Sequence, residues 1–489
     1  MPVEACETAL RGAELAIRRG APGEAERALR VLLRSCPQGG GSRVHLVLAS
    51  ALVATEKFQE AIESLGRWKP GTAAPGETAL AAQLKAEAMH RGRLADDYAI
   101  LDSADAAVSA AEAARADLIL CRALQIRAEV AAESGKLRDA LQARTQAERA
   151  AERSENPESR AVARLTGGYC LLVAGRYEAA ATTFSAAVPI LRDLGLLIEL
   201  WRAYNGLGMC STGLGCMKDA SESFAQAFTV ARKIGDNLAI CNVWNNLGVV
   251  YHNSGCFQRA AACYERSAEL LASSRFRRAP FYVFANLARL AMESGDFAAS
   301  ERWSTLCHAG AKESQSWRLI VGALANRADL HIAKSEPEWA WPLVQEAVDI
   351  AGDRWVFVPD AGQFARLRKH LLWASTGCKR EENESHRDIP GGMGVSERLE
   401  VQAFEDWTRS GRDGAALREA AARELVDRGL FGVLARLLAV GLRFSIVPEP
   451  ESGESSAQLV ARVFRPQERW ALPEVDDLVR QGDGLSHSA

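Results

Sequence analysis

The sequence predicts an all-α fold, a right-handed superhelical solenoid of antiparallel helix pairs, and three observations lead to it. At 489 residues the chain is longer than one compact core usually allows, so several domains or an extended repeat array are expected. A block of forty residues occurs six times in register, and its copies start at Cys121, Ala161, Trp201, Cys241, Phe281 and Val321. The eighth, twentieth and twenty-seventh positions of every copy hold only Gly, Ala, Ser or Cys, and such small residues let two helix backbones approach closely. Such a period indicates stacked helix pairs.

Each block begins with a predicted amphipathic helix. Large apolar residues recur at its fourth, seventh and eleventh positions, which share one face at helical spacing. We expect this helix to begin a few residues ahead of the block, near Asp236 or Asn237 in the block that starts at Cys241. A second helix follows, and its alanine and aromatic residues are expected to pack back onto the first. The first helix is expected to end at a glycine in the fifteenth position, namely Gly135, Gly175, Gly215, Gly255 and Gly295.

The block that starts at Cys241 carries the fullest motif. In chain order it has Trp244, Leu247, Gly248, Tyr251, Ala260 and Tyr264. This pattern resembles the tetratricopeptide repeat, which reads W-x2-L-G-x2-Y and then A-x3-F. The common repeat has about 34 residues, and the longer period here is similar to that of kinesin light chains, Leu-Gly-Asn spindle adaptors and maltose-regulator-type bacterial activators. The resemblance implies a helical array whose concave groove binds peptides or proteins.

The same patterns divide the chain into five segments. Weaker repeats start near Cys6, Ser42 and Ala81, ahead of the core array. After the array we expect a charged linker without periodicity, a small helical cap, and a mostly disordered tail rich in Pro, Glu, Ser and Gly. The segments are residues 1–120 for the degenerate repeats, 121–378 for the core array, 379–396 for the linker, 397–444 for the cap and 445–489 for the tail.

The C-terminal part carries three further expectations. The array should end in a partial ninth unit with Phe364, Leu367 and Leu371. Residues 430–444 form a predicted helix that is apolar nearly all round and too short to span a bilayer. This helix is expected either to be a buried cap or to mediate self-association or another partner contact. One short helix is expected in the tail, near Val475 to Arg480.

Composition excludes several classes of partner. The net charge is −3 without a basic stripe, so nucleic acid is not an expected partner. No run of eighteen apolar residues is present, and the first twenty residues form a charged helical pattern, so neither a membrane span nor a signal peptide is expected. The 11 cysteines are scattered without a C-x-x-C pair, as expected of reduced packing thiols in a cytoplasmic protein.

No motif for catalysis, a cofactor or a metal ion is found. The stretch Ser134-Gly135-Lys136 lacks the upstream glycine of a phosphate-binding loop, and no nucleophile elbow is present. The 8 histidines show no zinc-binding spacing with one another or with cysteine. We therefore expect a protein that is not an enzyme, with no catalytic residue, no metal site and no cofactor.

The second, fifth, sixth, ninth and thirteenth positions of a block lie away from the packing face of its first helix, so they should line the groove. In the middle blocks these positions are rich in amides. The predicted groove residues are Arg202, Asn205, Asn242, Asn245, Asn246, Asn253, Tyr282, Asn286, Arg289, Asn326 and Asp329. Asparagine is a poor helix former, yet Asn246, Asn286 and Asn326 share the sixth position. Such a ladder either hydrogen-bonds the backbone of an extended peptide, or is solvated, or bridges neighbouring helices.

The function predicted from these observations is a non-catalytic scaffold or adaptor that binds a peptide or protein segment in the groove. Arg122, Arg202 and Arg289 line the same face, where they either select an acidic or C-terminal carboxylate group or are simply solvated. The alternative is a regulatory protein that senses a ligand or peptide. It would act on a separate effector or be a fragment of a larger chain, because the sequence has neither a phosphate-binding loop nor a recognisable DNA-reading helix-turn-helix.

Overall fold

The computed structural model describes residues 3–18, 20–35, 41–69, 74–92, 94–273, 282–313, 317–352, 367, 395–409, 420–428, 430–440, 442, 444 and 447–464. In these ranges the regular structure is helical throughout, as the sequence predicts. The chain divides into two compact units. Unit 1 consists of Met1–Leu207 and Gln226–Asp236, and unit 2 consists of Gly208–Ala225 and Asn237–Ala489.

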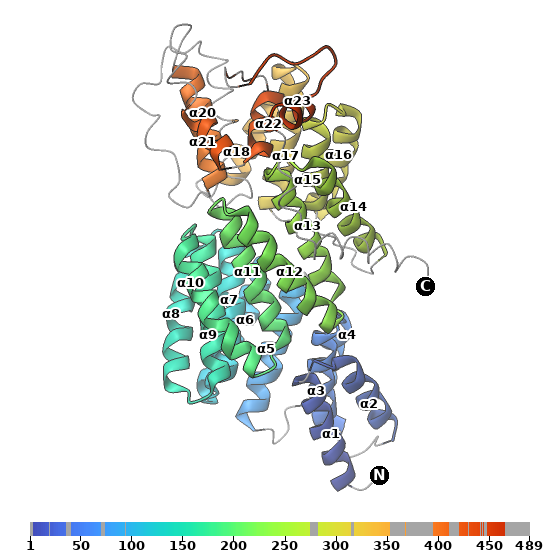
Figure 1. Ribbon diagram of the computed structural model, residues 1–489. Helices are drawn as coiled ribbons and strands as arrows, with labels where there is room; N and C mark the ends of the chain where they lie inside the picture. Colours follow the sequence, from blue (N-terminus) through green and yellow to red (C-terminus); the bar gives the residue numbers. More distant parts are fainter. Residues whose placement is uncertain are drawn as a thin grey trace. The chain divides into compact units, whose positions relative to one another are not determined.

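Unit 1 is built of helix pairs, in which the first helix (helix A) packs on the second (helix B) across a short turn (Figure 1). Its helices are α1 (Val3–Arg18), α2 (Pro22–Ser35), α3 (Gly41–Ala54), α4 (Phe58–Arg67), α5 (Pro75–Arg91), α6 (Asp97–Ala113), α7 (Asp117–Glu133), α8 (Leu137–Arg153), α9 (Pro157–Val173) and α10 (Tyr177–Asp193). Two helices contribute residues to both units, α11 (Leu197–Gly213) and α12 (Met217–Ile234).

Unit 2 continues the helix pairs and adds a C-terminal group of helices. The pairs are α13 (Asn237–Asn253) with α14 (Phe257–Ser273), α15 (Tyr282–Glu293) with α16 (Phe297–Glu313), and α17 (Trp317–Ala333) with α18 (Pro337–Ala351). The C-terminal group is α20 (Val395–Arg409), α21 (Ala420–Asp427), α22 (Phe431–Ala439) and α23 (Ser456–Phe464).

The forty-residue period is visible in the helix boundaries. Two helices of 17 residues and two three-residue turns fill the period, as α9 and α10 illustrate. The start of α13 at Asn237 confirms where the first helix of that block was expected to begin. The A helices α7, α9, α11, α13 and α17 begin forty residues apart or a multiple of that, at Asp117, Pro157, Leu197, Asn237 and Trp317.

Glycine ends helix A, as predicted. At the first of these turns the Gly135 N–H donates to the Ala132 carbonyl, and the Lys136 N–H donates to the Ala131 carbonyl. This left-handed cap satisfies the last carbonyls of the helix, and a residue without a Cβ adopts it at little steric cost. All five fifteenth-position glycines have φ between 68° and 79°, and they are Gly135, Gly175, Gly215, Gly255 and Gly295.

The tightest contacts within a pair join the eighth position of helix A to the twenty-fourth position on helix B. An added Cβ at Gly168 would lie 2.7 Å from the Phe184 ring. The other pairs of this kind are Gly208 with Phe224 and Gly248 with Tyr264. The three blocks with alanine at the eighth position have a non-aromatic residue at the twenty-fourth, namely Arg144, Ser304 and Val344. In these six blocks an aromatic ring lies on the helix A backbone where glycine leaves room for it.

A buried ion network holds the C-terminal helices against the other helices of unit 2. Arg436 of α22 is 5% exposed, and its guanidinium lies 3.2 Å from Glu293 of α15 and 2.8 Å from Glu400 of α20. His252 of α13 places its Nε2 2.7 Å from Glu293. Although burial raises the pKa of Glu293, the His252 imidazole and the Arg436 guanidinium hold it below its ordinary value. Gly432 lies against the His252 carbonyl, where a Cβ would not fit.

The apolar side chains of α22 point into unit 2. Most of them are at most 4% exposed, namely Val433, Leu434, Ala435, Leu437 and Leu438, while Phe431 and Ala439 are half-buried. The described residues of this helix are therefore mostly buried, as expected of a cap helix, and self-association through residues 430–444 stays a prediction. The helix itself is shorter than that range, because it ends at Ala439.

Regular structure at the C-terminus extends further than the sequence analysis expected. Helix α20 begins at Val395, inside the expected linker, whose residues 379–394 lie outside the described residues. Helix α23 lies in the segment where a mostly disordered tail was expected. Its Phe464 ring stacks on Phe431 of α22 with centroids 5.6 Å apart, and its Leu459 and Val460 are buried. This apolar face, rather than the polar composition of the segment, determines the local structure.

Some expectations fall on residues that the structure does not describe. These are the tail beyond residue 464, with its short helix near Val475 to Arg480, and Phe364 and Leu371 of the partial ninth unit. The third residue of that unit, Leu367, is described and is buried in the hydrophobic cluster of α17 and α18.

The contact at the eighth position predicts a specific cost for one methyl group. Gly168→Ala should lower the free energy of unfolding by about 1–3 kcal/mol, because the Phe184 ring has to move. Gly12→Ala in α1, where an added Cβ meets nothing within 4 Å, should instead stabilise by roughly 0.5–1 kcal/mol. In a Phe184→Val background Gly168→Ala should cost less than in wild type, since Ala328 occurs naturally with Val344. Urea unfolding measures all three, and a Gly168→Ala variant as stable as wild type would contradict the packing argument.

The ion network around Arg436 predicts strong destabilisation when its cation is removed. Arg436→Met leaves two carboxylates buried without their guanidinium, which typically costs about 3–5 kcal/mol. Adding Glu400→Gln should restore part of this, whereas Arg428→Ala, which breaks an exposed pair with Glu424, should cost about 0.5 kcal/mol or less. Chemical unfolding followed by circular dichroism provides the comparison. Equal unfolding midpoints for Arg436→Met and Arg428→Ala would show that the ion network does not stabilise the packing of the C-terminal helices.

Candidate functional site

The predicted groove residues of unit 2 form a hydrogen-bonded network across successive A helices. The Asn286 amide on α15 donates to the Asn245 oxygen on α13 over 2.9 Å. Asn245 in turn donates to Asn246 over 3.4 Å. From α17 the Asn326 amide donates to the Ala285 carbonyl over 3.4 Å. The amides therefore link α13, α15 and α17, which is the bridging role that the sequence analysis left open.

Exposure divides these residues into two groups. Six of them are buried, with at most 8% exposure, and these are Asn245, Asn253, Asn286, Arg289, Asn326 and Asp329. Asn242, Asn246 and Tyr282 are half-buried, and the Tyr282 hydroxyl donates to the Asn242 oxygen. The half-buried residues are the ones that a molecule from outside can reach, while the buried ones hold the neighbouring helices in place.

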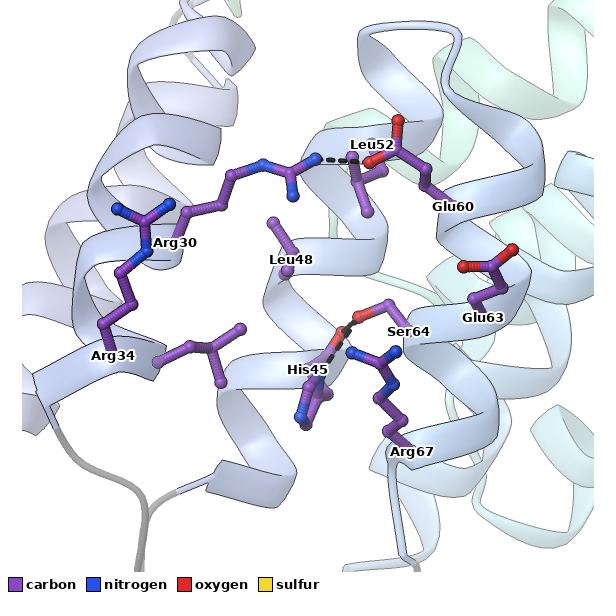
Figure 2. Close-up of a pocket in the computed structure, with 10 residues that line it drawn as sticks. Arg30, Arg34, His45, Leu48, Leu52, Glu60, Glu63, Ser64 and Arg67 are labelled. Carbon is purple, nitrogen blue, oxygen red and sulfur yellow. Dashed lines mark hydrogen bonds and ion pairs between the residues drawn. The ribbon is translucent and has the colours of Figure 1, made fainter.

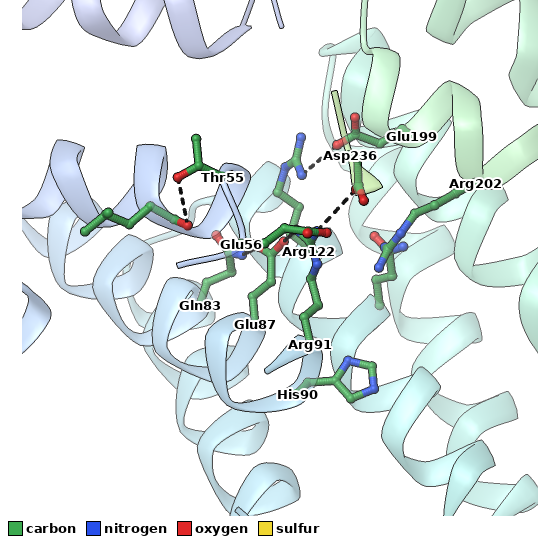
Figure 3. A network of polar contacts seen from close by, with 12 residues as sticks. Thr55, Glu56, Gln83, Glu87, His90, Arg91, Arg122, Glu199, Arg202 and Asp236 are labelled. Atoms are coloured by element: carbon green, nitrogen blue, oxygen red, sulfur yellow. Dashed lines mark hydrogen bonds and ion pairs between the residues drawn. The ribbon is translucent and has the colours of Figure 1, made fainter. Parts of the chain in front are cut away.

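Arg202 and Asn205 lie in unit 1, where both are half-buried on α11. Arg202 belongs to a charged network on the helix A side that runs from α5 to α11 (Figure 3). Its guanidinium lies 3.3 Å from Glu129 of α7, although α9 follows α7 and precedes α11 in the chain. Side chains of A helices that are not successive therefore meet, which requires this face of unit 1 to curve inward.

Each arginine of this network has carboxylate partners. Arg122 of α7 lies 2.6 Å from Glu158 and 2.9 Å from Glu199. On α5, Arg91 lies 3.3 Å from Glu87 and 3.7 Å from Glu56. The charges meet from four A helices and two turns, so they form one electrostatic unit.

Carboxyl groups outnumber guanidinium groups in this network. The carboxyl groups belong to Glu56, Glu87, Glu129, Glu133, Glu158, Glu199 and Asp236, and the guanidinium groups belong to Arg91, Arg122 and Arg202. His90 lies between two of the carboxylates, 3.7 Å from Glu129 and 3.4 Å from Glu133. The excess of carboxyl groups gives the face a negative potential that attracts cationic groups.

Two glutamines orient carboxylates in the same way on neighbouring A helices. The Gln83 amide donates to Glu87 over 2.8 Å, and the Gln125 amide donates to Glu129 over 2.9 Å. Although burial raises the pKa of Glu87, the nearby arginines, with Arg91 foremost, hold it below its ordinary value. Glu87 is therefore ionised at neutral pH and is held in a fixed position.

The edge of the network contains a pair of carboxyl groups. Glu56 follows α3 in a turn with φ of 60°, and Asp236 precedes α13. Burial, together with the negative charge of Asp236, raises the pKa of Glu56 to about 9. Within the described part of the chain, the Oε1 atom of Glu56 has no hydrogen-bond partner. Glu56 is thus protonated at neutral pH, and a further cation beside it, in addition to Arg91, would favour release of that proton.

The structure speaks against selection of an acidic group by the three arginines singled out from the sequence. Arg122 and Arg202 are paired with glutamates, and Arg289 donates to the Asn286 oxygen over 2.7 Å. An acidic ligand would have to displace these partners, and at Arg122 and Arg202 it would also approach a face with excess negative charge.

Sequence reasoning missed most of the unit 1 network. Gln125, Glu129 and Glu133 occupy the fifth, ninth and thirteenth positions of their block, so the groove rule identifies them once it is applied outside the middle blocks. Helix α5 starts at Pro75, two residues out of register with the later repeats, which hides its polar face. Glu56 and Asp236 lie in turns and carry no positional signal.

Within the described ranges no group of three or more His, Cys, Asp and Glu side chains has the geometry to hold a metal ion. Across the same residues no helix is both long enough and apolar enough to cross a membrane.

Comparisons with known proteins identify a repeat family and several solved structures to which this chain is similar. A tetratricopeptide repeat family model matches residues 201–273, and the sequence has no match among curated proteins. A crystal structure of a Rap protein complexed with competence and sporulation factor has a TM-score of 0.53 and 15% identity, and the match covers 72% of this chain and 99% of that one. Aspartyl phosphate phosphatase F from Bacillus subtilis has a TM-score of 0.43 and 11% identity, with 77% and 92% covered. The Rap conjugation gene regulator of plasmid pLS20 in complex with the Phr* peptide has a TM-score of 0.41 and 14% identity. That match covers 82% of this chain and 97% of the regulator.

The raised pKa of Glu56 predicts a pH-dependent contribution to stability. Between the ordinary value of 4.5 and about 9, the folded protein holds a proton that the unfolded chain has released. The stability contributed by Glu56 therefore falls as pH rises through this window, and it levels off above it. Glu56→Gln cannot ionise, so its melting temperature relative to wild type should rise between about pH 5 and about pH 9. Glu152→Gln on the exposed side of α8 should show a constant difference, and parallel curves for Glu56→Gln would contradict the assignment.

Proposed function

We propose that this tetratricopeptide-type repeat protein is a non-catalytic scaffold that binds a peptide or protein segment along the helix A faces of its repeats. The inward-curving charged face of unit 1 carries the proposal, because side chains of α5, α7 and α11 converge there. Its excess of carboxyl groups favours a segment with basic side chains over an acidic one. Arg122 and Arg202 separate the carboxylates along the face, so basic side chains of the ligand would bind at intervals rather than anywhere on it.

The polar face of unit 2 would contribute hydrogen bonds instead of charge. Half-buried Asn242, Asn246 and Tyr282 offer donors and acceptors that suit the backbone of an extended segment. Asn245 and Asn286 are buried and bonded to each other, so they would hold the accessible side chains in position before a ligand arrives. A face ordered in advance loses less side-chain entropy on binding.

The thiols support placement of the protein in a reducing compartment such as the cytoplasm. Every described cysteine is free. Burial raises the pKa of Cys121, Cys170, Cys210 and Cys307 to about 12. These thiols stay protonated and unreactive at neutral pH, as expected of packing residues rather than nucleophiles.

A regulatory sensor is the second candidate. The Rap protein with the similar fold was crystallised in complex with competence and sporulation factor, so a helical array of this kind is compatible with binding such a factor. In that case the bound segment would be the signal, and a separate effector would respond to it. A ligand that changes the hydrogen exchange of both units would favour the sensor over a passive scaffold.

The proposal is tested by selecting ten-residue peptides from a random display library on the full chain. We expect enriched peptides that contain lysine or arginine, because the unit 1 face has excess negative charge. Their affinity, measured by fluorescence anisotropy, should fall at least about tenfold in the triple variant Glu87→Gln, Glu129→Gln, Glu199→Gln. It should fall less in Asn242→Ala with Asn246→Ala, which removes only neutral hydrogen bonds.

A matched control carries the same change in charge on the B helices. The exposed residues Glu152, Glu178 and Asp193 are replaced by their amides, and binding should stay as in wild type. Failure to enrich any peptide would refute the scaffold proposal. So would enriched peptides that bind the triple variant and the control variant equally well.

A further inference from the structure

Glu56 lies in a turn of the kind that other repeats close with glycine. Between α3 and α4 the Lys57 N–H donates to the Leu52 carbonyl, as the Lys136 N–H donates to a carbonyl of α7 in the next such turn. Glu56 has φ of 60° there, where Gly135 has φ of 77°. A residue with a Cβ is strained in this conformation, so the turn itself does not explain the glutamate.

Glu56 faces a second carboxyl group at the edge of the charged network. Arg91 of α5 lies 3.7 Å from Glu56 and 3.9 Å from Asp236, and Figure 3 shows the three side chains together. Direct hydrogen bonds between arginine and a carboxylate are about 2.7–2.9 Å long, so Arg91 is too far from both for one. Its closer partner is Glu87 of its own helix, at 3.3 Å. One guanidinium is therefore shared among three carboxyl groups.

Neighbouring carboxylates have cations of their own. Glu26 of α2 lies 2.7 Å from Lys57, and Glu60 of α4 forms an ion pair with Arg30 of α2, which Figure 2 shows. Although burial raises the pKa of Glu26, Lys57 and Arg30 hold it below its ordinary value. The lysine next to Glu56 in the chain is thus bound elsewhere and does not neutralise it.

A proton takes the place of a cation at Glu56. The charged groups that face it are Asp236 from the turn before α13 and Arg91 from α5. Burial, the charge of Asp236 and a hydrogen bond to Asp236 raise the pKa of Glu56 to about 9. Its Oε1 atom is buried without a hydrogen-bond partner among the described residues. The side chains of Glu56 and Asp236 are 11% and 12% exposed, so part of each remains open to an entering group.

We propose that Glu56 and Asp236 form a subsite for one basic side chain of the bound segment, and that this side chain replaces the proton of Glu56. The inference rests on the scaffold function proposed above and names one place where a basic residue binds. In the exchange the O–H bond of Glu56 breaks and its proton passes to the solvent. The carboxylate that forms pairs with the guanidinium or ammonium group of the ligand. Binding is therefore coupled to proton release.

The test is isothermal titration of the full chain with a decapeptide of alternating arginine and alanine, acetylated and amidated at its ends. Arginine stays charged near neutral pH, so the peptide itself does not titrate. Titrations in phosphate and in Tris, whose ionisation enthalpies differ, give the number of protons released on binding. At about pH 8 we expect about one proton per bound peptide, and the affinity should rise about three- to tenfold from about pH 7 to about pH 8.

Two variants separate the subsite from general attraction to the charged face. Glu56→Gln is neutral and can still donate to Asp236, so the fold should be retained, and circular dichroism checks this. It should release less than about 0.2 proton on binding, with an affinity that stays nearly constant over the same pH range. Glu63→Gln removes an exposed carboxylate of α4, labelled in Figure 2, and should release protons as wild type does.

The outcomes distinguish the subsite from the scaffold function. A peptide that binds wild type without proton release would overturn the subsite and leave the scaffold function standing. Equal proton release by wild type and Glu56→Gln would also overturn the subsite, because another group would then be titrating. If the peptide does not bind wild type at all, the scaffold function fails, and the subsite fails with it.

Discussion

The architecture depends on how closely helix A and helix B can approach at one position in each repeat. Gly168, Gly208 and Gly248 have no Cβ, so an aromatic ring of helix B lies directly on the helix A backbone. The Phe184 ring is held on two sides, because an added Cβ at Gly206 of α11 would lie 2.6 Å from it. One ring thus spaces two successive A helices in unit 1. Dense packing of this kind fixes the separation of the helices, which in turn sets the positions of their polar faces.

These fixed helix positions determine which polar residues contact one another. On unit 1 the A helices bring Glu87, Glu129 and Arg202 together from three places distant in the sequence. On unit 2 the corresponding positions hold amides, and Asn245 and Asn286 satisfy each other across neighbouring helices. Burying such groups is tolerated because their partners are present, and removal of one partner leaves the other with a desolvation cost. The same repeat therefore supports a charged surface in one unit and a neutral hydrogen-bonding surface in the other.

The sequence was informative where a residue's role is local and less so where it depends on distant partners. Period, turn glycines and the start of α13 at Asn237 follow from helical spacing and cap chemistry, and the structure confirms them. The pairing of Arg202 with Glu129 does not, because it needs the curvature of several repeats. Helix α23 was missed because its stability comes from contacts such as Phe464 on Phe431, which composition does not reveal. The amides were placed on the correct helices, but whether they bridge or stay accessible depended on their neighbours.

Photo-cross-linking tests most directly the central claim that ligands bind along helix A. A selected peptide that carries benzophenone at successive positions is bound to the full chain, irradiated and mapped by mass spectrometry. Binding along helix A predicts adducts on the A helices, at the polar faces of α5, α7 and α11 in unit 1 or of α13 and α15 in unit 2. It also predicts that adducts move from one A helix to the next as the benzophenone moves along the peptide. Adducts concentrated on the B helices α8, α10, α14 and α16 would contradict it.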